Sequence, residues 1–189
     1  MNELERQKLL DGGYVEVPKT MSMALANTIG MIMSLCISAI CLLIFLKFAT
    51  LDDLKRMSIP ILIMGILILT VVHELMHGIP WALFCKNKFK SIKFGVKWKY
   101  LTPYCHCKEI LKLSHYTIGV AMPLIITGII PYIISVITVD INLLIISLAM
   151  IAGASGDIIM LFMVCREKGS LVCDYPDRYG CIVYRKKHE

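Results

Sequence analysis

Charged side chains are scarce in this sequence. Asp, Glu, Lys and Arg make up 18% of its 189 residues, whereas hydrophobic residues make up 57% and the mean hydropathy is +0.71. A soluble domain carries about a quarter charged residues, so this composition excludes an ordinary soluble globular protein. Because the few charges leave long apolar runs uninterrupted, the sequence indicates an integral membrane protein.

Two further features are missing. Residues 1–20 are polar and mixed in charge, with neither an apolar core nor a small-residue cleavage site, so we expect no cleaved signal peptide. No nucleic-acid-binding motif is present either, and we predict no nucleic-acid partner. The net charge of +6 comes from Lys and Arg that cluster beside the apolar runs, which favours an anionic lipid bilayer surface as their partner.

Four apolar runs are long enough to cross a membrane. A helix of ~20 residues spans a hydrocarbon core of about 30 Å, and lipid cannot satisfy the polar groups of any irregular backbone. We therefore predict an all-α integral membrane protein with about four transmembrane helices. The runs are residues 21–46, 59–84, 113–139 and 141–164.

The connecting segments differ in positive charge. With both termini in the cytosol, 17 Lys and Arg residues lie inside and 3 lie outside, and the opposite orientation reverses these numbers. The positive-inside rule therefore predicts a multi-pass protein of the cell membrane with both termini cytosolic. We divide the chain into a cytosolic N-terminal segment (residues 1–20), a four-helix membrane domain (21–164) and a cytosolic tail (165–189).

Two cytosolic segments have strand-like patterns. Residues 90–99, between the second and third helices, interleave Lys with apolar and aromatic residues, which predicts a short β-like hairpin. This hairpin is either solvated beside anionic headgroups or a strand edge that binds an extended substrate. The tail contains two short apolar runs that are interrupted by Pro176 and Gly180. These runs form either a small cytosolic appendage or a hairpin that docks a substrate or partner.

The eight cysteines do not predict a disulfide framework. Cys36 and Cys41 lie in the first apolar run, where we interpret them as small buried hydrophobic residues. The other six fall in segments assigned to the cytosol, where thiols are normally reduced.

The second apolar run contains His73-Glu74-Leu75-Met76-His77. Residues i and i+4 share one face of a helix, so both imidazoles can bind one Zn²⁺, and Glu74 is placed to take a proton from the attacking water. Ionisable side chains are costly inside a membrane and usually serve a function there. We therefore predict a catalytic zinc site within this helix.

A catalytic zinc site requires a third protein ligand. Apart from Cys and Tyr, the other runs contain only two ionisable residues, His115 near a cytosolic end and Asp157. From the start of their runs, His73 and His77 lie roughly 21 and 27 Å along the helix and Asp157 roughly 24 Å. Small residues at 153–156 allow close helix approach. We predict Asp157 as the third ligand; the alternative is a packing network of hydrogen bonds.

The second loop contains Tyr104-Cys105-His106-Cys107. Adjacent strand residues point to opposite faces, so three consecutive side chains suit a second metal ion poorly. We interpret His106 either as an ordinary loop histidine or as a contact for the substrate or the developing oxyanion.

These motifs resemble those of a known family. Together with Gly156-Asp157, they are similar to the zincin membrane peptidases catalogued as a domain of unknown function, which are distantly similar to site-2 proteases, the intramembrane zinc metalloproteases. The resemblance extends from about the second helix to the tail, and weakly to the first helix. Site-2 proteases usually have glycine after the metal-binding aspartate, whereas Ile158 follows Asp157 here. The resemblance implies a zinc peptidase fold with its site in the membrane.

The sequence therefore predicts an integral-membrane zinc metalloprotease that cleaves membrane-associated or transmembrane proteins. His73, His77 and Asp157 would bind Zn²⁺, and Glu74 would act as general base and then as proton donor. The alternative is a non-proteolytic metal-binding sensor, transporter or adaptor of the membrane. His₂-carboxylate sites also accept other divalent ions. The sequence predicts neither the cleavage site nor the oligomeric state.

Overall fold

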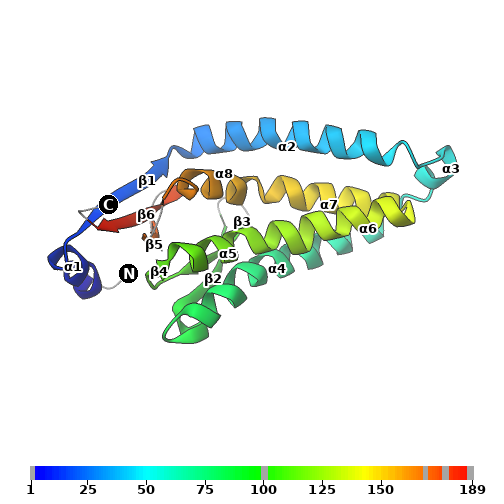
Figure 1. Cartoon of the computed structure of the whole chain (residues 1–189). Coiled ribbons are helices and arrows are strands. Elements are labelled where there is room, and N and C mark those ends of the chain that lie inside the picture. Colours follow the sequence, from blue (N-terminus) through cyan, green and yellow to red (C-terminus); the bar gives the residue numbers. More distant parts are fainter. Residues whose placement is uncertain (1–2, 99–101, 168–169, 176–178, 187–189) are drawn as a thin grey trace.

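Long helices lie side by side through most of the molecule, and a small sheet closes one end of them (Figure 1). This arrangement comes from a computed structural model, which describes residues 3–98, 102–167, 170–175 and 179–186. The four apolar runs form the helices α2 (Met23–Phe45), α4 (Ile59–Phe84), α5 (Leu113–Pro123), η2 (Leu124–Ile129), α6 (Ile130–Thr138), α7 (Ile141–Gly153) and α8 (Ser155–Val164).

Three of these helical stretches are long and apolar enough to cross a membrane: Met23–Phe45, Ile59–Phe84 and Leu113–Thr138. The number rises to four if the bent pair α7 and α8 forms one span. The α2 and α4 surfaces expose many large apolar side chains, such as Leu35 and Ile63, as expected of helices that contact lipid. The prediction of a mostly helical membrane protein is therefore confirmed at this level.

The fourth run is not one straight helix as predicted. α7 and α8 meet at Ala154 with a bend of 42°, and Ala154 leaves helical geometry at φ −77° and ψ 3°. Gly153 and Gly156 flank the break, and glycine is a weak helix former because its backbone loses the most entropy on ordering. The bend sets the direction in which α8 presents Asp157.

The third run is also irregular. Its middle section, η2, is a π-helix that begins directly after Pro123. Proline has no N–H and crowds the carbonyl four residues earlier, so a regular α-helix is interrupted there. Short π-helical insertions are frequent at functional sites because they shift the side chains that follow.

The prediction of an all-α fold is wrong at the ends of the chain. β1 (Tyr14–Met21), β6 (Tyr179–Lys186), β5 (Leu171–Asp174) and β4 (Leu111–Lys112) form one antiparallel sheet in that order. The register pairs Tyr14 with Lys186 and Met21 with Tyr179. β5 and β6 confirm the two strand-like runs predicted in the tail, whereas no local pattern predicts the pairing of β6 with β1 at the opposite end of the chain. The terminal strands therefore lie at the same end of the molecule, and α1 (Glu3–Asp11) precedes them.

The hairpin expected between the second and third membrane helices is present. β2 (Ile92–Lys97) pairs with β3 (Thr102–Cys107), with Ile92 opposite Cys107; Lys99, at the end of the predicted segment, lies outside the described residues. A short helix, η1 (Lys88–Ser91), connects α4 to this hairpin. Phe94 and Ile92 pack against Gly78, where a Cβ would lie 2.3 Å from Phe94 Cζ. The hairpin therefore folds back along α4.

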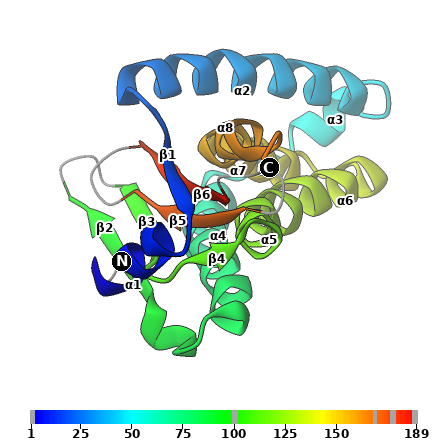
Figure 2. The same cartoon turned by 60° about the vertical axis from the view of Figure 1, so that its left-hand side comes forward.

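The helices form layers that position the candidate site. In both views α2 lies on one side of α7 and α8, and α4 lies on the other (Figures 1 and 2). The short α3 (Leu51–Leu54) lies between α2 and α4 in the chain, at the end away from the sheet. The largest buried cluster includes Trp81 of α4, Cys107 of β3, Tyr116 of α5 and Val183 of β6. The site elements thus share a core with the terminal sheet.

Candidate metal centre

Two imidazoles and one carboxylate converge between α4 and α8. Nε2 of His73 lies 3.2 Å from Oδ2 of Asp157, and Nε2 of His77 lies 3.3 Å from Oδ1. One ligand atom from each residue lies within 4.8 Å of the others. The rings of His73 and His77 stand edge to face, with centroids 5.1 Å apart. The structure therefore brings together the three residues that the sequence nominates as ligands, close enough to share one ion.

The outer nitrogen of His77 has a backbone partner. Nδ1 lies 2.9 Å from the carbonyl oxygen of Gly119 on α5. A carbonyl only accepts, so Nδ1 carries the proton and donates it, and Nε2 keeps its lone pair. This lone pair points to Asp157, which is the arrangement that a metal-binding histidine requires.

His73 has a similar partner on its outer side. Its Nδ1 lies 3.5 Å from Oγ1 of Thr127 in η2. The Thr127 hydroxyl donates its own proton to the carbonyl oxygen of Pro123 at 2.8 Å. Its oxygen is therefore left to accept from the Nδ1–H of His73. Both histidines then turn an unprotonated Nε2 toward the same carboxylate.

This donor set fits a divalent metal ion. Oδ2 of Asp157 is buried and has no hydrogen-bond partner among the described residues, although His73 Nε2 is only 3.2 Å away. Two imidazole lone pairs and an anionic carboxylate repel one another at such distances unless a cation lies among them. Two imidazole nitrogens and one carboxylate oxygen are a usual donor set for catalytic zinc.

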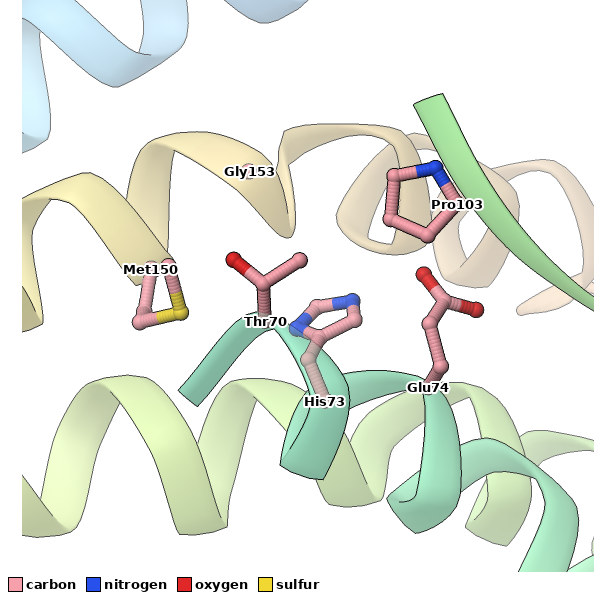
Figure 3. A pocket seen from close by; sticks show the side chains of 6 residues that line it. All are labelled: Thr70, His73, Glu74, Pro103, Met150 and Gly153. Carbon is pink, nitrogen blue, oxygen red and sulfur yellow. The ribbon is translucent and has the colours of Figure 1, made fainter. Parts of the chain in front are cut away.

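Glu74 lies beside this cluster without belonging to it. It lines a pocket with His73 and Thr70 of α4, Pro103 of β3, and Met150 and Gly153 of α7. Figure 3 shows the Glu74 carboxylate pointing toward Pro103, with the His73 ring beside it. The backbone N–H of Cys105 donates a hydrogen bond to this carboxylate. The hairpin therefore holds Glu74 at the wall of a pocket that also reaches His73.

The structure does not bring His106 to the cluster. Pro103 and Cys105 face α4, and His106 lies on the other face of β3 because strand residues alternate. Nδ1 of His106 lies 3.3 Å from Oδ2 of Asp174 on β5. Asp174 also accepts hydrogen bonds from the Cys107 N–H at 3.0 Å and the Tyr116 hydroxyl at 2.7 Å. His106 thus joins a network between the hairpin and the tail, and does not line the pocket.

An aromatic stack packs against the ring of His77. Its ring stacks on Trp81 at a centroid distance of 5.4 Å, and Trp81 stacks on Tyr116 at 5.6 Å. Nε1 of Trp81 donates to the Tyr116 carbonyl oxygen at 3.0 Å. A Cβ at Gly119 would lie 2.1 Å from Trp81 Nε1, so only glycine allows α5 to approach this closely.

The small residues before Asp157 act differently from the prediction. They do not pack α8 against α4: Gly153 lines the pocket, and Ser155 contacts Gly30 of α2. Gly156 lies under Tyr179 of β6. The prediction also missed Gly119 and Thr127, whose partner roles depend on contacts between helices that the sequence does not display.

Two cysteine thiols lie near the base of the hairpin. Sγ of Cys85 and Sγ of Cys107 are 3.5 Å apart, and both residues are buried. Burial raises the pKa of the Cys105 and Cys107 thiols, so these groups stay protonated at neutral pH and behave as small apolar side chains.

Comparison with known proteins identifies a family. A family model described as "Putative zincin peptidase" matches residues 66–172. The matched segment contains the two histidines, Glu74, Asp157 and the whole hairpin, and it ends within β5. No curated protein and no solved structure matches the chain.

Proposed function

The chain belongs to the family described as putative zincin peptidases, and from this premise we propose that it is an integral-membrane zinc endopeptidase with its active site among the apolar helices. The family implies a metallopeptidase that uses zinc. Three helices, or four if the bent pair is one span, are long and apolar enough to cross a membrane, which indicates a membrane protein. The active-site residues, the site-2-protease-like mechanism and the class of substrate are our proposals.

One observation carries the assignment of ligands. Both histidines hydrogen-bond through Nδ1 to partners on the third span and turn Nε2 toward Asp157. A packing network would instead need a protonated Nε2 that donates to Asp157, whereas a histidine whose Nδ1 carries the proton turns an unprotonated Nε2 toward this carboxylate. We therefore assign His73, His77 and Asp157 as the zinc ligands.

The residues around the ligands supply the remaining chemistry. Zinc bound there would polarise the scissile carbonyl and favour ionisation of the attacking water. Glu74 accepts the proton of that water and passes it to the leaving amine. The Cys105 N–H orients the Glu74 carboxylate through its hydrogen bond. Residues of α7 and β3 complete the wall of the pocket.

The surroundings of the pocket favour a membrane-associated substrate. Thr70 and His73 lie in the middle part of α4, whose neighbouring side chains Leu67 and Val71 are exposed large hydrophobic residues. A substrate would therefore reach the pocket through an apolar environment. β3 lies along the pocket with Pro103, and its backbone carbonyl oxygens offer acceptors for an extended peptide.

Elemental analysis of the detergent-purified protein tests this proposal. We expect about one zinc ion per chain in the wild type, as a single three-ligand site requires, and a strong loss in His77→Ala and in Asp157→Ala. Cleavage of tagged single-span membrane proteins in liposomes should require the same residues. Zinc retained without cleavage of any such protein would instead support a sensor or adaptor. Zinc absent from folded wild type would overturn the proposal.

A further inference from the structure

The tail of the chain reaches the candidate metal centre. Tyr179, the first residue of β6, donates a hydrogen bond from its hydroxyl to the carbonyl oxygen of Gly156. Its ring lies over the same glycine, where a Cβ would lie 3.4 Å from the hydroxyl oxygen and 3.7 Å from Cε2. Gly156 directly precedes Asp157. We propose that Tyr179 is a positioning residue that holds Asp157 in place for metal binding, an inference that rests on the proposed function.

Asp157 lies directly after an irregular part of its own helical run. α8 begins after a bend of 42°, and its N-cap, Ala154, makes no side-chain cap hydrogen bond. A Cβ at Gly153 would meet nothing within 4 Å, whereas Ala154, the residue at the break, is fully buried. Asp157 lies in the first turn after it. The bond to the Gly156 carbonyl therefore acts in this first turn, one residue before Asp157.

Tyr179 itself is held by the terminal sheet. Its neighbour Gly180 has φ +136°, and a Cβ there would lie 2.1 Å from the Lys19 carbonyl oxygen of β1. Only glycine fits such a conformation and such an approach. The pairing of Tyr179 with Met21 continues the same register. The position of the phenol is thus fixed by β1 as well as by its own strand.

Ion pairs also connect the sheet to the C-terminal end of α8. The buried Glu167 carboxylate, just beyond that helix, lies 2.9 Å from Lys19 Nζ and accepts hydrogen bonds from Arg185 of β6. β6 therefore contacts the first turn of α8 through Tyr179 and the chain after α8 through Arg185. A strand rises about 3.3 Å per residue and a helix 1.5 Å, so β6 is long enough to lie along the whole helix.

The phenol is suited to a constant donor role. Burial raises the pKa of Tyr179 above its ordinary value of 10.0. The hydroxyl therefore stays protonated and donates throughout the neutral range. It acts through the Gly156 backbone, so it positions a ligand and takes no direct part in catalysis. The matched family segment ends at residue 172, which places Tyr179 outside it.

Removal of the hydroxyl alone tests the proposal in the full-length, detergent-purified protein. We expect Tyr179→Phe to weaken zinc affinity about 10-fold or more, the usual effect of losing a group that supports a ligand. Competition with a chelator of known affinity measures this loss. The absorption spectrum of the Co²⁺-substituted protein should change as well, because it reports ligand geometry. Tyr184→Phe is the matched control, since its hydroxyl on the same strand donates to Glu16.

The outcomes separate the two proposals. Wild-type affinity and spectrum in Tyr179→Phe, with metal lost in Asp157→Ala, would overturn the role of Tyr179 alone. An unchanged Asp157→Ala would overturn the third ligand and the proposed function with it. Thermal unfolding of the metal-free proteins distinguishes positioning from general stability. If metal-free Tyr179→Phe unfolds at a markedly lower temperature than Tyr184→Phe, its effect is structural and the proposal fails.

Discussion

His77 Nδ1 donates to the carbonyl oxygen of Gly119 across 2.9 Å, and this carbonyl is open to the histidine because the residue four positions later is Pro123. In a regular helix the N–H of residue 123 would bind it, but proline has none. The same proline offers its own carbonyl to Thr127, the partner of His73. One interruption of the third span thus positions the hydrogen-bond partners of both histidines.

Replacement of this proline should weaken the metal site. Pro123→Ala restores an N–H that competes with His77 for the Gly119 carbonyl, and it allows the helix to continue through η2. We expect zinc affinity to fall about 10-fold, as for other groups that orient metal ligands. Chelator competition measures the change. Pro60→Ala is the control because Pro60 lies at the start of α4, where a missing N–H breaks no helical bond; equal effects of the two variants would contradict the interpretation.

A side chain at Gly119 should disturb the aromatic stack. In Gly119→Ala the new Cβ would lie 2.1 Å from Nε1 of Trp81, so α5 and α4 must separate or Trp81 must leave its place under His77. Overpacking of this kind costs roughly 1–3 kcal/mol of unfolding free energy. Thermal unfolding in detergent should show a lower melting temperature and a changed tryptophan emission. Gly153→Ala should keep the melting temperature of the wild type, since its Cβ would meet nothing within 4 Å.

Asp174 should matter for stability more than an ordinary surface carboxylate. It accepts hydrogen bonds from the Cys107 N–H and the Tyr116 hydroxyl and lies 3.3 Å from His106. In Asp174→Ala the Tyr116 hydroxyl, which is buried, loses its acceptor. An unsatisfied buried donor costs about 1–3 kcal/mol, so chemical denaturation should begin at lower denaturant. Asp52→Ala changes an exposed residue and should be as stable as the wild type. A loss of stability similar to that of Asp174→Ala would contradict the special role of Asp174.

The membrane helices and the nominated site residues follow from local patterns, because length, hydropathy and the i, i+4 spacing of His73 and His77 are visible in short windows. Asp157 can be nominated because charge is so scarce in the apolar runs. The tail strands β5 and β6 also lie on local apolar runs, but the pairing of β6 with β1 cannot be predicted in this way, since Tyr14 pairs with Lys186 across the length of the chain. The bend at Ala154 is hidden too, because the hydropathy of the fourth run continues through it.

Protonation of the Glu167 carboxylate should destabilise the protein in acid. Hydrogen bonds from Arg185, and then from Lys19, hold the pKa of this carboxyl below its ordinary value of 4.5 in spite of its burial. A depressed folded-state pKa stabilises the protein above the unfolded-state pKa, and this contribution is lost as pH falls through the folded-state pKa. The melting temperature should therefore drop below about pH 4.5. Glu167→Gln should have a lower melting temperature than the wild type already at neutral pH. Its melting temperature should also change less as the pH falls than that of the exposed control Glu3→Gln.

Glu74→Gln separates metal binding from proton transfer. Glu74 lines the pocket beside His73 but is not among the atoms that converge on the metal position, so the variant should bind zinc like the wild type. Glutamine also keeps an oxygen that accepts from the Cys105 N–H, and the pocket wall should therefore stay in place. A neutral amide cannot take the proton of the attacking water, and loss of a general base slows a reaction about 10²- to 10⁴-fold. Two measurements test this: the rate at which the variant cleaves single-span membrane proteins in liposomes, and the amount of zinc that it binds. Zinc lost together with activity would make Glu74 a ligand, and undiminished cleavage would place the base elsewhere.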